Sequence, residues 1–233
     1  MAKIKYSALV SDMRNKLNGS VLSKNRYGSY VRNKVTPVNP QTSFQLNQRA
    51  NLATLSSAWR GLTQVQRDSW SAAAKDTPFT DIFGDIKHLT GQALFVGRNL
   101  NLLKSGNGII SSPGVAVDVP VITAGAVELE VTTGAVTSVE FTGITPGSVP
   151  AGFKLVVYAT PAYGPGISFV KNKYRYLGTY AVTGGVLDIT ADWSARFGGA
   201  SVGDKASFKL ALVSNTTGQL GLASSVEDVF ASA

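Results

Sequence analysis

The feature that most constrains this chain is a change in the spacing of its apolar residues near residues 106–113. Before that point, apolar residues recur three and four positions apart, as on one face of a helix. After it, short apolar runs alternate with polar residues and are separated by turn residues. The junction is rich in glycine, serine and proline, which marks a boundary. We therefore expect an α+β chain of several domains, with residues 1–40, 41–110 and 111–233 as its three parts.

Residues 41–110 predict a small helical domain. Three helices are expected, over residues 42–61, 63–76 and 90–106. Each is preceded by a threonine that can cap the first turn, and a glutamine three residues later completes a capping box for the first two. The first two helices should form an αα-hairpin with Trp59 and Trp70 at its centre, and Val65 should face the first helix.

Residues 111–233 predict an all-β domain. Gly, Thr, Val and Ser dominate, and turn signals separate short runs of strand residues. One face of each strand should be buried and the other wet. Many short strands at this spacing are typical of an immunoglobulin- or fibronectin-like β-sandwich. The expected strands cover residues 115–121, 127–131, 138–142, 153–160, 174–182, 186–189, 207–213 and 224–230.

Residues 1–40 show no helical period and predict an extended arm with hairpin turns. Asn18-Gly19 is the preferred pair for a type I′ hairpin turn, and the segment 25–28 ends in Gly28, which accepts a positive φ. Two prolines in residues 36–40 favour a stiff, extended connector to the first helix. The arm has too few apolar residues for a core of its own, so it should need another surface to lie on.

The charge of the chain is concentrated in its first quarter. The whole chain carries +8. Residues 1–60 hold ten basic residues and one acidic residue, a net charge of +9, whereas residues 61–110 carry +1 and residues 111–233 carry −2. Such asymmetry predicts a patch that faces an anionic partner. An acidic protein surface, a nucleic acid and a merely solvated face all remain open at this point.

Basic residues and tyrosines interleave in the arm, and they are the candidate partner-binding residues. Arginine and tyrosine are enriched at the centres of protein interfaces. The same mixture suits phosphate contact with base stacking, but the segment has no RRM, KH or zinc-finger signature. The candidates are Arg14, Lys16, Lys24, Arg26, Tyr27, Tyr30, Arg32 and Lys34.

The sequence contains no known catalytic or metal-binding motif. The chain has no cysteine and a single histidine, His88, and it lacks nucleophile-elbow and phosphate-loop motifs. Three aspartates in residues 76–85 lack calcium-loop spacing. Glu128 and Glu130 share one strand face, where we expect them to keep an edge strand wet. We therefore expect no enzymatic activity, no cofactor and no metal.

Membrane association is not expected either. No apolar stretch approaches the 18 residues that a membrane-spanning helix needs. The N-terminal residues lack the hydrophobic segment and cleavage site of a signal peptide.

Four runs of the sequence resemble a family of phage virion proteins. They cover residues 11–21, 24–30, 34–42 and 57–70, and include Asn18-Gly19 and the segment from Trp59 to Trp70. Together they span about residues 11–75. Similar proteins occur in crAss-like and other phages of Bacteroidetes and in related prophages. The resemblance implies a virion structural protein that is assembled in the host cytoplasm.

The resemblance is compatible with more than one place and role. The leading hypothesis is an auxiliary or decoration protein, whose basic arm clamps acidic surfaces of the major capsid protein. A collar, portal-adjacent or tail protein that assembles as a ring is the next alternative, and it would be a homo-oligomer. A DNA-binding protein packaged in the head is a third. A sugar-binding module is a fourth, with Trp193, Tyr163 and Tyr176 as stacking residues.

Overall fold

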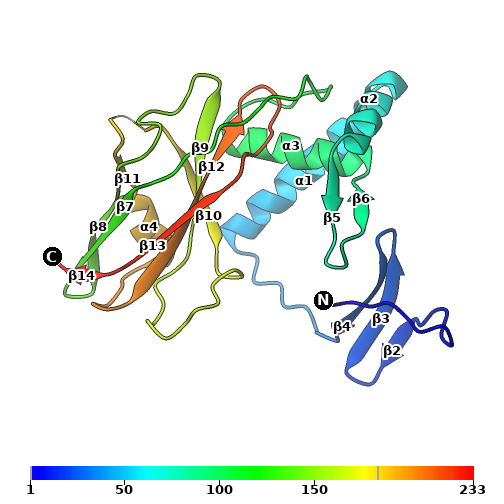
Figure 1. Ribbon diagram of the computed structural model, residues 1–233, viewed down its shortest axis with the longest axis horizontal. Helices are drawn as coiled ribbons and strands as arrows, with labels where there is room; N and C mark the ends of the chain where they lie inside the picture. The colour runs from blue at the N-terminus through cyan, green and yellow to red at the C-terminus, as the bar shows by residue number, and fades with distance from the viewer. Residues whose placement is uncertain (1, 183) are drawn as a thin grey trace.

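The α+β class expected from the sequence is confirmed. A computed structural model describes residues 2–182 and 184–233. Within these residues the chain forms four helices and several mostly antiparallel sheets (Figure 1). None of the described helices is long and apolar enough to cross a membrane.

The N-terminal segment forms a small four-stranded sheet, which we call the N-terminal sheet. Its strands are β1 (Ala2–Lys3), β2 (Asn15–Leu17), β3 (Ser20–Asn25) and β4 (Gly28–Asn33), in the order β1-β4-β3-β2. Both turns lie where the sequence predicts them: Asn18-Gly19 joins β2 to β3, and Gly28 has a φ of 112° after the β3–β4 turn. The type I′ geometry expected for Asn18-Gly19 is wrong, because Asn18 has a positive φ of 52° and Gly19 does not have one. No described residue before Leu55 is buried, so this sheet has no core of its own.

The three helices begin where their caps predict. They are α1 (Ser43–Gly61), α2 (Gln64–Lys75) and α3 (Gly91–Lys104). The side chains of Thr42, Thr63 and Thr90 each accept a hydrogen bond from a first-turn N–H group. At Thr63 the reciprocal bond from the cap N–H to the Gln66 side chain is also present, which completes a capping box.

The predicted αα-hairpin is wrong in its packing. Both α1 and α2 pack mainly against α3, and the centre of this cluster is Phe95 of α3. Its ring lies 5.3 Å from that of Trp59 and 5.4 Å from that of Trp70. Val65, expected in the interface, is 79% exposed. The prediction paired α1 with α2 and left out α3. This helix of 14 residues offers one apolar surface on which both α1 and α2 pack.

A short hairpin links α2 to α3. Its strands are β5 (Pro78–Thr80) and β6 (Ile86–His88). It lies against the N-terminal sheet (Figure 1), where Lys3 forms an ion pair with Asp81. The residue pattern predicts no strand here, because each strand has only three residues.

The C-terminal part contains two further sheets that share one core. The first has the order β10-β9-β12-β13 and the second β11-β8-β7-β14. Apolar side chains of β7, β8, β9 and β12 meet between them, with the rings of Phe141 and Phe208 5.1 Å apart. The strands are β7 (Ala126–Thr132), β8 (Ala135–Thr142), β9 (Phe153–Ala159), β10 (Arg175–Tyr180), β11 (Leu187–Asp188), β12 (Lys205–Ser214), β13 (Ser224–Val229) and β14 (Ala231–Ser232).

Three expectations for this part are wrong. Residues 115–121 form no strand. They include Pro120, which has no N–H group for a ladder, and the Val117 N–H donates to the Gln219 side chain instead. A fourth helix, α4 (Thr190–Phe197), interrupts the β region. The outer face of β12 is not wet, because α3 packs against that strand and leaves Ala211 and Val213 buried.

Candidate functional site

The N-terminal sheet presents a basic and aromatic face. Directly paired residues of an antiparallel sheet point to the same side. Lys16, Val21 and Arg32 form one such row across three strands. Tyr30 lies in the next row, on the same side as Lys3. The alternation of the strands therefore gathers Lys16, Arg32 and Tyr30 on one face.

The other candidate residues are spread around this sheet. Lys24 pairs with Ser29, so it points to the opposite face. Arg14 lies before β2 and forms an exposed ion pair with Asp12, with 2.9 Å between nitrogen and oxygen. Lys34 follows β4. The eight candidates thus do not form a single patch.

The β3–β4 turn contacts the rest of the molecule. The ring of Tyr27 lies edge-on to that of Phe79 in β5, with centroids 5.8 Å apart. Arg26 lines a cavity of about 410 Å³ together with Lys75 and the exposed His88. Tyr27 therefore has an intramolecular partner, and the turn fixes one end of the sheet on the helical region.

An ion pair makes a second contact between the N-terminal sheet and the β5–β6 hairpin. The Lys3 ammonium lies 2.7 Å from the Asp81 carboxylate at the tip of the β5–β6 hairpin. This hydrogen bond is the largest cause that lowers the pKa of Asp81 to about 2, and N–H groups of Phe83 and Asp85 lower it further. The carboxylate is ionised at neutral pH, so the contact persists there.

Two of the three aromatic residues considered for sugar stacking are buried. Trp193 on α4 is fully buried between Phe197 and Phe230, and its indole N–H donates to the Thr160 carbonyl. The Tyr163 hydroxyl lies 2.5 Å from the Ser207 hydroxyl in the interior. Neither ring can stack on a sugar, which removes the basis for a sugar-binding module at these residues.

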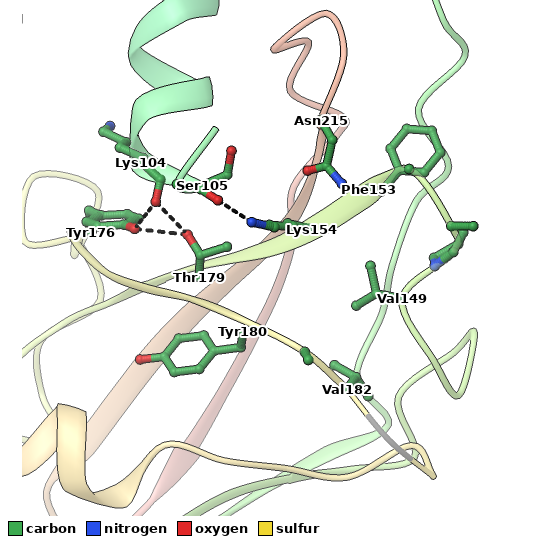
Figure 2. A pocket seen from close by; sticks show the side chains of 15 residues that line it. Lys104, Ser105, Val149, Phe153, Lys154, Tyr176, Thr179, Tyr180, Val182 and Asn215 are labelled. Atoms are coloured by element: carbon green, nitrogen blue, oxygen red, sulfur yellow. Dashed lines mark hydrogen bonds between the residues drawn. The ribbon is translucent and has the colours of Figure 1, made fainter. Parts of the chain in front are cut away.

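Tyr176, the third of these residues, lines the cavity of Figure 2. This cavity has a volume of about 660 Å³ and lies where the C-terminus of α3 meets β9 and β10. The hydroxyl groups of Tyr176 and Thr179 lie 3.0 and 3.1 Å from the Lys104 carbonyl oxygen. Lys154 donates to the next carbonyl, that of Ser105. These donors satisfy carbonyl groups that the end of a helix leaves unpaired.

Two lysines, Lys104 and Lys154, line the cavity together with Tyr176 and Tyr180. The Lys104 ammonium lies 5.3 Å from the ring centre of Tyr176 and 5.9 Å from that of Tyr158. Burial lowers the pKa of Lys104 and is the main cause that raises the pKa of Tyr158. Because Tyr176, Thr179 and Lys154 are already bonded to carbonyl groups at the helix end, we interpret this cavity as a structural joint. The sequence held no local signal for it, since its residues lie far apart in the chain.

The acidic residues singled out in the sequence do not form a metal site. No cluster of three or more metal-ligating side chains occurs in residues 2–182 and 184–233. Glu128 and Glu130 point away from the core on β7, which is not an edge strand as expected but lies between β8 and β14. Glu128 pairs directly with Glu140, which in turn pairs with Asp188. This acidic row faces outward.

The basic face of the N-terminal sheet, with Lys16, Arg32 and Tyr30 on one side, is therefore the best candidate for an interaction site. The comparisons with known proteins do not assign it to a family: no protein-family model, curated protein or solved structure matches the chain.

Proposed function

We propose that this protein is a non-enzymatic structural component of a phage virion. It acts as an auxiliary or decoration protein that binds an acidic surface of the capsid shell through the basic face of its N-terminal sheet. The major capsid protein is its partner. In this proposal the C-terminal part is exposed to solvent as a sandwich of immunoglobulin type.

One observation carries the proposal. Residues 2–54 contain a four-stranded sheet and no buried residue, while they hold nine basic residues and one acidic residue. Small sheets without a hydrophobic face against a core are marginally stable in water. A sheet of this kind is stabilised when it binds a surface of opposite charge. The resemblance of residues 11–75 to phage virion proteins supports the same role.

The proposal includes an immunoglobulin-like fold for the C-terminal part and the role of an arm for the N-terminal sheet. Two sheets with a common core are compatible with an immunoglobulin-like sandwich, although α4 and the parallel pair β14–β7 are additions to that pattern. The N-terminal sheet, followed by residues 34–42 without helix or strand, serves in this view as the arm that reaches the shell.

The proposal is tested by co-sedimentation with capsid shells that lack this protein. The double variant Lys16→Gln/Arg32→Gln removes two exposed charges from one row of the basic face. Central interface arginines contribute more than about 1 kcal/mol each, so we expect affinity to fall by about tenfold or more.

The matched control removes two charges elsewhere. Arg60 at the end of α1 and Lys171 are both exposed, and the double variant Arg60→Gln/Lys171→Gln changes the net charge equally. It should bind shells as the wild type does. Equal affinities of the two double variants would contradict the proposal.

Binding of packaged DNA is the second candidate, because the basic face also carries Tyr30. Phosphate contacts with base stacking would give retention on DNA and an affinity that falls steeply with salt. Such retention, with no binding to shells, would assign the basic face to DNA.

A further inference from the structure

Three arginines from separate elements line one cleft between the start of α1 and the C-terminal part. Arg49 lies on α1, Arg175 begins β10, and Arg196 lies in the last turn of α4. Figure 1 shows α1 beginning close to β10 and α4. The cleft has a volume of about 640 Å³ and is completed by Thr42, Phe44, Gln45 and Gln48.

No carboxylate balances these charges. The cleft has no acidic residue in its lining, and no ion pair within the described residues includes an arginine of this cleft. Asp192, the acid nearest to Arg196 in the sequence, accepts a hydrogen bond from the Tyr180 hydroxyl at 2.7 Å instead. Arg175 donates to two backbone carbonyls, which leave its charge uncompensated.

Arg196 is the most constrained of the three. Its guanidinium carbon lies 3.1 Å from the centre of the Phe44 ring, which holds the group at the cleft. Its Nη1 atom is buried and has no hydrogen-bond partner among the residues that the structure describes. Burial first, and the charge of Arg175 second, lower its pKa from the usual value. A buried donor without a partner is costly, so a ligand that accepts from it gains affinity.

We propose that this cleft binds a multiply charged oxyanion, held by the guanidinium groups of Arg49, Arg175 and Arg196. Guanidinium groups donate two parallel N–H bonds to carboxylate and phosphate oxygens. The positive end of α1 and the side-chain amides of Gln45 and Gln48 favour the same ligand. This inference goes beyond the virion role and holds independently of it.

The volume and shape of the cleft define the ligand further. Cavities of about 300–1,000 Å³ hold small molecules or short segments. A nucleic-acid strand needs an extended basic groove, whereas these arginines converge on one cavity. The oxyanion is therefore a free phosphate compound or the carboxylates of an acidic protein segment.

The test is calorimetric titration at low ionic strength in a buffer without phosphate. Sodium pyrophosphate and a hexaglutamate peptide are the two probes, and they distinguish the two sources. We expect saturable binding of at least one probe to the wild type. The variants Arg196→Gln and Arg175→Gln should each weaken that binding at least tenfold.

Arg60→Gln is the matched control, because Arg60 is exposed on the same helix as Arg49 and does not line the cleft. It should change affinity less than twofold. Arg196→Lys keeps the charge but loses the planar fork, and it should bind more weakly than the wild type. The near-ultraviolet circular dichroism of the aromatic side chains, which include Trp193 on the same helix as Arg196, verifies the fold of each variant.

Two results would overturn the inference. One is the absence of saturable binding of either probe to the wild type. The other is an Arg196→Gln variant that folds and binds as tightly as the Arg60→Gln control. If Arg196→Gln does not fold, the Arg175→Gln variant decides in the same way.

Discussion

Trp70 shows how one side chain joins two parts of the molecule. It is fully buried, its ring lies edge-on to Phe95, and its indole N–H donates to the Ser111 carbonyl at 2.8 Å. The aromatic contact holds α2 against α3, and the hydrogen bond holds the segment that leads to the C-terminal part.

These two contributions are separable. Trp70→Phe keeps an aromatic ring but leaves the Ser111 carbonyl without its donor, which should lower the free energy of unfolding by about 1–3 kcal/mol. Trp70→Ala should lower it by about 3–5 kcal/mol. Denaturant unfolding measures both, with the exposed Val65→Ala as a control expected within about 0.5 kcal/mol of the wild type. A Trp70→Phe variant as stable as the wild type would show that the hydrogen bond contributes nothing.

Asp81 gives a prediction on pH. Its pKa in the folded protein, about 2, lies below the ordinary value of 3.8, mainly because Lys3 donates to it. A lowered carboxyl pKa stabilises the contact above pH 3.8, and this contribution is lost as the pH falls through 2. In Lys3→Gln the pKa should rise part of the way to 3.8, since the backbone N–H groups still lower it. Carbon-detected NMR of the Asp81 carboxyl measures the shift, and an unchanged midpoint would refute the role of Lys3.

Among the helices and strands, α3 is the element that packs against both the helical part and the C-terminal part. Its one side holds α1 and α2 through Phe95, and it also covers the outer face of β12. The loop after β12 contacts it closely: the Asn101 side chain donates to the Gly218 carbonyl at 3.0 Å. Gly218 has a φ of +66°, and a methyl group there would collide with the Arg98 carbonyl oxygen of α3.

Gly218→Ala therefore combines backbone strain with a collision against a helix. Strain of this kind costs about 1–3 kcal/mol, and forced displacement of packed elements adds about 1–3 kcal/mol. Gly134→Ala is the matched control, with a φ of +83° and open space around the added methyl group. Thermal unfolding should show a clearly larger loss of stability for Gly218→Ala. Equal losses would mean that α3 does not rest on this loop.

What the sequence predicts depends on whether the signal is local. Thr63 and Gln66 form a capping box within four residues of chain, and Asn18-Gly19 forms its turn alone, so both were predictable. The packing of Trp59 on Phe95 depends on residues far apart and was missed. Helix α4 has no side-chain cap hydrogen bond at Ile189 and is short, so its only sequence signal was Trp193 and Phe197 four residues apart.

The candidate sites also differ in whether local sequence signals predict them. The basic character of residues 1–40 was visible in the composition, and strand alternation could have placed Lys16 and Arg32 together once the turns were known. The cleft of Arg49, Arg175 and Arg196 was not visible, because three distant segments build it. Long-range packing alone brings those residues to one place.

The two ends of the molecule carry surface charges of opposite sign. The N-terminal sheet carries the basic face, while Asp188, Glu140 and Glu128 form an acidic row across β11, β8 and β7. Figure 1 shows these two regions at opposite ends of the molecule. Under the proposed function, we expect a chain with this polarity to bind an acidic surface in one orientation, with its basic end inward. This is the arrangement that the decoration role requires.

Hydrogen exchange with mass-spectrometric readout, on the isolated protein and on the same protein bound to particles, tests the central claim most directly. Because no residue of the N-terminal sheet is buried, its amides should exchange quickly in the isolated protein. On the particle, residues 15–33 should exchange at least about tenfold more slowly, which corresponds to about 1.4 kcal/mol. The amides of β9 and β12 should not change. Unchanged exchange in residues 15–33, with protection elsewhere on the bound protein, would contradict attachment through the N-terminal sheet.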